Sequence, residues 1–116
     1  MNKLMTVAVI DSGIYPHIDF KNRIVAFKDF VNGRKNAYDD CGHGTHVSGI
    51  IAGSGYASHG RIKGICPAAR LAGIKVLDRL GNGRIENVLD ATDWIISHQK
   101  DLNIRIVNIS FGATTF

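Results

Sequence analysis

Three short, nearly continuous apolar segments constrain the fold more than any other feature of this sequence. They cover residues 4–10, 71–77 and 104–109, and each has the length of a strand that is buried on both faces. Residues 23–30 alternate with a period of two, which predicts a further and more peripheral strand. Because helical patterns separate these strands, we expect parallel pairing through right-handed crossovers. The predicted fold class is therefore α/β, with a parallel β-sheet flanked by helices.

Two of the segments between the predicted strands have helical patterns. Residues 43–52 are small and apolar and predict a buried helix, whereas residues 85–98 predict an amphipathic one. The expected core-facing side chains of the second helix are Ile85, Val88, Leu89, Thr92, Ile95 and Ile96. Residues 32–36 and 53–60 contain Gly and Asn at positions that favour turns, and they predict exposed loops.

Polar residues stand where a parallel sheet forms its ligand crevice, outside the carboxyl ends of the strands. Asp11 follows the first predicted strand and Ser110 follows the last. His43 begins the first predicted helix, between two glycines that permit close backbone approach. Asp11 and His43 are candidates for an acid–base pair, although an aspartate after a strand also caps turns and a lone histidine is commonly structural. For His46 we expect the structural role.

Four motifs in order resemble those of the subtilisin-like serine proteases. They are Val-Ala-Val-Ile-Asp-Ser-Gly at 7–13, Asp-Asp-Cys-Gly-His-Gly-Thr-His at 39–46, Gly-Ile-Cys-Pro-Ala-Ala at 64–69 and Val-Asn-Ile-Ser-Phe-Gly at 107–112. The resemblance extends over nearly all of the 116 residues. Among that family, the sequence resembles the intracellular, AprX-like members in particular.

The resemblance implies that residues 1–116 are the N-terminal portion of a subtilisin-like peptidase domain, with an incomplete subtilisin-like sheet. Asp11 would orient His43, and His43 would accept the proton of a nucleophilic serine. In the family that serine and the oxyanion asparagine lie further along the chain, and none of the serines here lies in a Gly-Thr-Ser-Met-Ala motif. We therefore expect a serine-type endopeptidase function that needs the remainder of the catalytic domain, and no triad hydrolysis by this chain alone.

The resemblance also implies two substrate-binding segments. Residues 80–83 match an edge segment that pairs with an extended peptide, and residues 110–112 match the segment on the other side of that peptide. Ile85 and Val88 match positions of a distal apolar pocket, and Phe111 stands where leucine is more usual, with a core position as the alternative. The expected substrate-binding residues are Gly81, Asn82, Gly83, Ile85, Val88, Ser110, Phe111 and Gly112. The expected partner is a peptide or protein substrate, with a preference for apolar or aromatic side chains.

Two alternative functions come from other classes of protein. One is a catalytically inactive subtilase fragment that acts as an interaction module, binding a partner through an exposed sheet edge and apolar face. The other is a small zinc-binding domain, in which Cys41, His43 and His46 are joined by Cys66 or His59. The sequence has neither the His-Glu-x-x-His arrangement nor paired Cys-x-x-Cys motifs, so we predict no metal site of this kind.

We expect no required cofactor, with calcium as the one ion to consider. By resemblance, Asp19 matches an aspartate that is a calcium ligand in secreted relatives. Residues 54–63 lack the asparagine-rich pattern that completes such a site, and one carboxylate does not supply the oxygen ligands that Ca²⁺ needs. We therefore expect Asp19 to be a solvated loop residue.

Charge and composition narrow the partners and the compartment. The net charge of +4 comes from 14 Lys and Arg against 10 Asp and Glu, with no basic run longer than Arg34-Lys35, so we expect no nucleic-acid binding. No apolar stretch approaches the roughly 20 residues of a membrane span. Residues 1–5 show no signal peptide, and the two cysteines indicate free thiols in a reducing compartment. We expect a cytoplasmic protein, or a secreted one if the chain starts at a mature domain.

Overall fold

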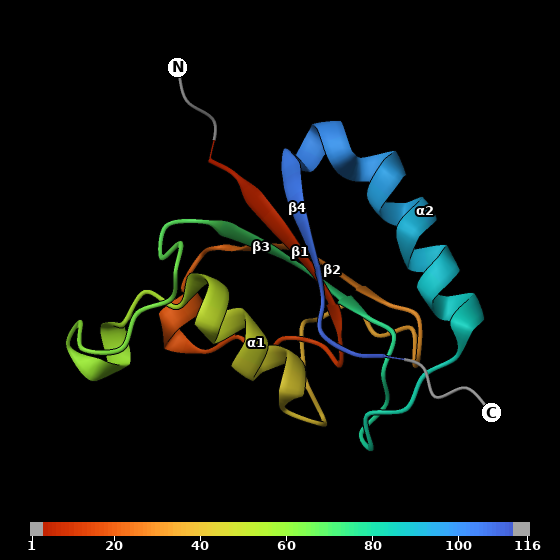
Figure 1. The fold of residues 1–116 in the computed structure, drawn as a ribbon, viewed down its shortest axis with the longest axis horizontal. Helices are drawn as coiled ribbons and strands as arrows, with labels where there is room; N and C mark the ends of the chain where they lie inside the picture. Colours follow the sequence, from red (N-terminus) through yellow and green to blue (C-terminus); the bar gives the residue numbers. More distant parts are fainter. Residues whose placement is uncertain (1–3, 113–116) are drawn as a thin grey trace.

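The structure, a computed structural model, describes residues 4–112 and contains a sheet of four parallel strands. The strands are β1 (Thr6–Asp11), β2 (Ile24–Asp29), β3 (Arg70–Lys75) and β4 (Ile104–Ile109). The helices are α1 (His43–Ala52) and α2 (Ile85–Leu102), with the 3-10 turns η1 (Ile18–Phe20) and η2 (Tyr56–Ser58). The strand order is β2-β3-β1-β4, and α1 and α2 lie on opposite sides of the sheet (Figure 1). This confirms the predicted α/β class and the parallel sheet flanked by helices.

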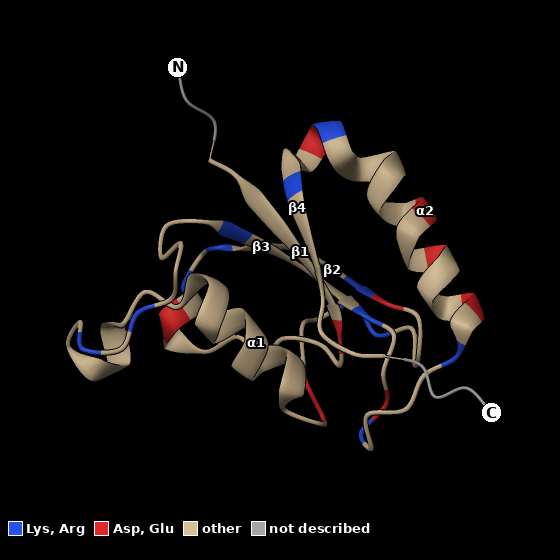
Figure 2. Ribbon diagram, in the orientation of Figure 1, with Lys and Arg blue, Asp and Glu red and all other residues tan. Residues whose placement is uncertain are grey.

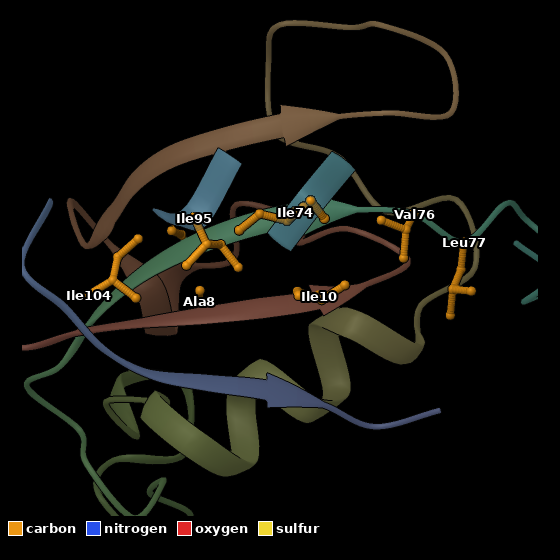
Figure 3. Packing of buried hydrophobic residues seen from close by; sticks show 9 residues of the cluster. Ala8, Ile10, Ile74, Val76, Leu77, Ile95 and Ile104 are labelled. Carbon is orange, nitrogen blue, oxygen red and sulfur yellow. The ribbon is translucent and has the colours of Figure 1, made fainter. Parts of the chain in front are cut away.

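The central strand β1 is buried along its whole length, as its continuous apolar sequence predicted. Successive side chains of a strand point to opposite faces. Ile10 therefore joins Ile95 of α2 in one core cluster (Figure 3), whereas Val9 joins Ala52 of α1 in a second cluster on the other face. The sheet thus separates two small cores.

The strand β4 is more exposed than its apolar sequence predicted. Of its residues only Ile104 is buried, and Ile106, Val107 and Ile109 are 47, 44 and 51 % exposed. The prediction of a buried strand was wrong because β4 lies at the edge of the sheet, and within residues 4–112 it pairs with β1 alone. An apolar edge of this kind presents unpaired backbone groups that suit pairing with another strand.

Both helices bury narrower stripes than predicted. α1 buries one small residue per turn, at positions 44, 48 and 52, so it is not the fully buried helix that its composition indicated. α2 buries Ala91 and Ile95. Four side chains predicted to face the core are exposed instead, namely Ile85, Leu89, Thr92 and Ile96. The buried side of α2 includes Ala91, which the prediction missed because it considered only the larger side chains.

Charge is distributed unevenly over the two helices. Figure 2 shows that α1 carries no Lys, Arg, Asp or Glu, whereas acidic residues recur along α2. Within the described part of the chain, no helix has the length and apolar character needed to cross a bilayer. Part of the segment 1–5, in which we expect no signal peptide, lies outside the described residues.

Candidate active site

The carboxyl end of β1 and the amino end of α1 meet, and they bring Asp11 and His43 together. Asp11 is the last residue of β1 and is fully buried, and His43 is the first residue of α1. The ring Nδ1 of His43 lies 2.9 Å from Oδ1 and 3.0 Å from Oδ2 of Asp11. A carboxylate is an acceptor only, so this geometry places the proton of a neutral ring on Nδ1 and leaves Nε2 as the basic nitrogen. The His43 side chain is 48 % exposed, and the ring is therefore accessible from solvent.

Two glycines make this close approach possible. A Cβ added at Gly44 would lie 2.1 Å from the carbonyl oxygen of Gly13, and one added at Gly13 would lie 2.1 Å from the carbonyl oxygen of Tyr38. Gly13 also has a φ of +122°, a region that residues with a side chain rarely adopt. The first turn of α1 thus rests directly on the backbone that follows β1.

Asp39 holds the segments on both sides of this contact. Its Oδ1 accepts hydrogen bonds from Ser12 Oγ at 2.8 Å and from the backbone N–H groups of Cys41 and Gly42 at 3.1 and 2.8 Å. Its Oδ2 accepts from the N–H and the hydroxyl of Thr45 at 2.8 and 2.6 Å. Burial by itself would raise the pKa of Asp39, but these hydrogen bonds together lower it below its ordinary value. Asp39 is therefore an ionised clamp between the end of β1 and the first turn of α1.

A second polar group, Lys75, lies beneath the pair and is fully buried. Its Nζ donates to the carbonyl oxygens of Ser12 and Leu77 and to Oδ1 of Asp40, each at 2.7 Å. An ammonium group has three N–H donors, so these acceptors satisfy it completely. Lys75 is also the register partner of Asp11 in the sheet.

The sequence interpretation missed Asp39, Asp40 and Lys75 as contributors to the site. Two signals were present. One is a lysine inside the otherwise apolar segment 71–77, and the other is a pair of consecutive aspartates just before Gly-His-Gly. A lysine in a buried strand needs a partner, and aspartates before a helix are natural acceptors for backbone N–H groups.

A groove of about 390 Å³ lies beyond the end of β3. Its lining consists of Leu77, Gly81, Asn82, Gly83, Arg84, Ile85, Val88, Phe111 and Gly112. Every predicted substrate-binding residue except Ser110 lines this groove, and the hydroxyl of Ser110 donates to Asn108 Oδ1 instead. The prediction omitted Arg84, which directly follows the predicted segment 80–83, and Leu77, which precedes it by three residues.

The groove adjoins the Asp11–His43 pair through Leu77. The N–H of Leu77 donates to the carbonyl oxygen of Asp11 at 3.2 Å. Phe111 lines the groove and also packs against the core beneath α2, so the two roles that the sequence left open for it coexist. The groove, whose lining combines apolar side chains with Asn82 and Arg84, is thus joined by one backbone hydrogen bond to the strand end that carries Asp11.

The surroundings of Asp19 do not fit a calcium ion. Its Oδ1 accepts the N–H of Ala57 at 2.8 Å, and its carbonyl oxygen accepts from the N–H of Ser54 and from Nη2 of Arg23. Calcium requires six or more oxygen ligands, and here Oδ1 and the carbonyl oxygen of Asp19 already accept from protein donors. The expectation of a solvated loop aspartate was wrong, because Asp19 lies in η1, its side chain is only 19 % exposed and its Oδ1 bonds the loop after α1.

Arg23 is the cation at this junction. Its Nη1 donates to the carbonyl oxygen of Ala69 at 2.6 Å, and its Nη2 donates to those of Asp19 and Ala52 at 2.5 and 2.7 Å. Burial lowers the pKa of Arg23, but a guanidinium group stays charged in proteins. The charged guanidinium group of Arg23 therefore binds three backbone carbonyl oxygens at once.

A zinc site does not form from the residues considered for one. Residues 4–112 contain no group of three or more His, Cys, Asp and Glu side chains placed to hold a metal ion. The two cysteines, Cys41 and Cys66, are free thiols, and Cys41 is exposed.

Comparison with known proteins gives a consistent result. A family model described as the Subtilase family matches residues 2–116. The chain is 46 % identical over 114 residues to serine protease AprX of Bacillus subtilis, and this match covers 96 % of the chain and 26 % of that protein. It is 39 % identical over 111 residues to subtilisin E of the same species, covering 94 % of the chain and 27 % of that protein.

A similar fold occurs in a solved structure, the crystal structure of a cold adapted subtilisin-like serine proteinase. The TM-score is 0.70 at 35 % sequence identity, and the match covers 80 % of this chain and 32 % of that one. The chain thus spans between a quarter and a third of the length of these relatives.

Proposed function

Because the chain belongs to the subtilase family, whose compared relatives are serine proteases, we propose that it supplies the aspartate and histidine of an Asp–His–Ser triad for peptide hydrolysis. The observation that carries this proposal is the hydrogen bond from Nδ1 of His43 to the buried carboxylate of Asp11. Nε2 accepts the proton of the nucleophilic serine, and Asp11 stabilises the imidazolium that forms. His43 later returns this proton to the leaving amine.

The nucleophile of this triad comes from polypeptide beyond the 116 residues. Ser12 is the serine next to Asp11, but its hydroxyl donates to Asp39 and accepts the N–H of Gly44. It is therefore committed to the structure of the turn. Without a serine and an oxyanion donor, the chain alone hydrolyses no peptide bond by this route.

The substrate is an extended peptide that lies along the groove. Backbone groups of residues 81–83 pair with it on one side, and residues 110–112 pair with it on the other. Ile85, Val88 and Phe111 form the apolar wall that receives an apolar or aromatic side chain. Main-chain pairing supplies affinity for many sequences, while the wall supplies selectivity.

A second candidate function is favoured by the exposed apolar edge at β4. On this alternative the chain is an inactive subtilase-like interaction module whose edge strand pairs with a partner protein. It predicts binding without hydrolysis and no requirement for Asp11 or His43.

The two candidates are separated by assembling the chain with a polypeptide that carries Gly-Thr-Ser-Met-Ala and adding a serine-directed phosphonate. The triad proposal expects labelling of that serine and cleavage of peptides only when both polypeptides are present. Asp11→Asn should then lower kcat by about 10⁴-fold, as loss of the orienting carboxylate does in other triads. Asp90→Asn, at an exposed position of α2, is the matched control. A complex that forms but neither labels nor cleaves would favour the interaction module.

A further inference from the structure

We propose that Lys75 is a positioning residue for the Asp11–His43 pair, acting through Ser12 and Asp40. The inference rests on the proposed function, because it concerns the geometry of the same pair. Lys75 does not contact the imidazole ring, and its one contact with a groove residue is the hydrogen bond to the backbone carbonyl of Leu77. Its influence is confined to the two chain segments that carry the pair.

The first segment is the end of β1. Asp11 and Lys75 are register partners on adjacent parallel strands, so their side chains leave the sheet on the same face. Nζ of Lys75 lies 2.7 Å from the carbonyl oxygen of Ser12, which directly follows Asp11. A second bond of 2.7 Å to the carbonyl oxygen of Leu77 fixes the ammonium group relative to its own strand. Lys75 thereby sets the direction in which the backbone leaves β1.

The second segment is the loop that leads into α1. Asp40 precedes His43 by three residues, and its Oδ1 lies 2.7 Å from Nζ of Lys75. The Lys75 side chain is fully buried, whereas that of Asp40 is 36 % exposed. The ammonium group of Lys75 thus links Ser12, which follows Asp11, to Asp40, which precedes His43.

The surroundings of Lys75 favour a role in geometry over a simple gain in stability. Burial of a charge is costly, and a buried ion pair as a whole is often replaceable by apolar residues without loss of stability, although removal of one partner alone is strongly destabilising. Lys75 nevertheless stands among apolar residues in β3, with all three of its donors used and with Nζ 5.2 Å from the ring centre of Tyr38. A methionine of similar length would fill this space and abolish every one of those contacts.

The direct test is proton NMR of the imidazole ring in the 116-residue chain. A Nδ1–H that is held against a carboxylate gives a resonance at unusually low field, and Asp11→Asn assigns the resonance by removing it. We expect Lys75→Met to remove or strongly broaden this resonance while the dispersed amide signals of β1 and β3 remain. Lys63→Met, at an exposed position in the loop after α1, should leave the resonance unchanged.

Asp40→Asn keeps the test decisive if Lys75→Met fails to fold, because Asp40 is partly exposed and its replacement spares the core. It should shift the resonance upfield and speed its exchange with water. Retention of the wild-type resonance in a folded Lys75→Met or Asp40→Asn chain would overturn the proposal.

Kinetics of the assembled protease supply a second readout. Lys75→Met should lower kcat by up to about 10²-fold, the scale of a misplaced catalytic group. The effect on KM should be smaller than that on kcat, because Lys75 does not line the groove and meets it only through the backbone carbonyl of Leu77. A rise in KM at constant kcat would contradict a positioning role. If no peptide is cleaved by the wild-type assembly but the resonance still depends on Lys75, the proposed function fails while the positioning role stands.

Discussion

Two cations fasten the opposite ends of α1, and they differ in what they hold. Lys75 is fully buried and joins a carboxylate, that of Asp40, to two backbone carbonyls next to the Asp11–His43 pair. Arg23 is partly buried and binds three backbone carbonyls, including that of Ala52, the last residue of α1. The first lies at the carboxyl ends of the strands and the second at their amino ends.

The difference shows how one helix is divided between function and support. At the carboxyl ends of parallel strands, where ligand crevices form, the clamp includes an ionic partner and constrains the orientation of side chains. At the amino ends the clamp uses neutral oxygens, which are the ligands that a hard metal ion would also take. Arg23 makes the kind of cross-link there that a bound cation would make, without needing one.

The largest expected effect is on stability, at the buried cation. Lys75→Met should lower the free energy of unfolding by about 3 kcal/mol, because it leaves Asp40 unpaired and two buried carbonyls without a donor. Urea unfolding followed by circular dichroism measures this change. Lys63→Met should remain within about 0.5 kcal/mol of the wild type. Equal values for the two variants would remove the distinction between the buried clamp and an ordinary lysine.

A smaller loss is expected at the other end of α1. Arg23→Met should cost about 2 kcal/mol, because it removes a donor from the carbonyl oxygens of Asp19, Ala52 and Ala69 but leaves no carboxylate unpaired. The low-field proton of His43 should be unchanged, in contrast with Lys75→Met. Arg61→Met, at an exposed position, controls for loss of charge. Loss of the His43 resonance in Arg23→Met would show that both clamps position the pair and would break the comparison.

The clamp formed by Asp39 should show itself in the pH dependence of stability. Its pKa is lowered in the folded chain, so its contribution is present above the ordinary carboxyl pKa of about 4 and is lost as the pH falls through the lower folded value. Asp39→Asn should therefore cost about 1.5 kcal/mol at pH 7, and this difference from the wild type should shrink below pH 4. Unfolding curves at several pH values test this. A difference that is constant down to pH 3 would contradict it.

In the middle of α1, replacement of the buried Ser48 by an apolar residue should stabilise the chain. Ser48 is fully buried, and its hydroxyl has no hydrogen-bond partner among the described residues. Ser48→Ala should stabilise the chain by about 1 kcal/mol, because it removes an unsatisfied group and improves helix propensity. A raised urea midpoint would agree with this. Ser97→Ala, at an exposed position of α2, is the control for the same substitution without burial. Destabilisation would mean that the middle of the helix also depends on a polar contact.

Calcium should produce no effect on the chain. If Arg23 satisfies the carbonyl oxygens near Asp19, the Tm in excess chelator should equal the Tm in millimolar Ca²⁺. A ligand that binds the folded state raises stability in proportion to the logarithm of its concentration, so a saturable increase in Tm would contradict the assignment of this junction to Arg23.

The strands and helices were predictable because their signals are local. The continuous apolar sequence of β1 and the alternating one of β2 gave the elements and their order, and the structure agrees within a few residues. The exposure of β4 was not predictable in the same way. Apolar side chains show that a strand is suited to burial, but only the three-dimensional arrangement shows which neighbours cover it.

The residues of the candidate site likewise divide into those with a local sequence signal and those recognisable only from contacts between distant segments. Asp11 and His43 were predicted from motifs that place a carboxylate at a strand end and a histidine at a helix start, and they lie within hydrogen-bonding distance. Lys75 was missed because two of its three partners, Ser12 and Asp40, come from segments more than thirty residues away in sequence. The roles of the groove residues and the cellular compartment stay predictions.

The contact between Gly44 and Gly13 also has an evolutionary consequence. Every missense change that a single nucleotide can make in a glycine codon introduces a side chain with a Cβ, and at either position that atom would meet a backbone oxygen. No single-nucleotide missense change at either glycine therefore avoids this clash, whereas the exposed residues of α1 beyond His43 have no such constraint. A lineage can change the surface of this helix step by step, but it cannot gradually move the point at which the helix rests on the sheet.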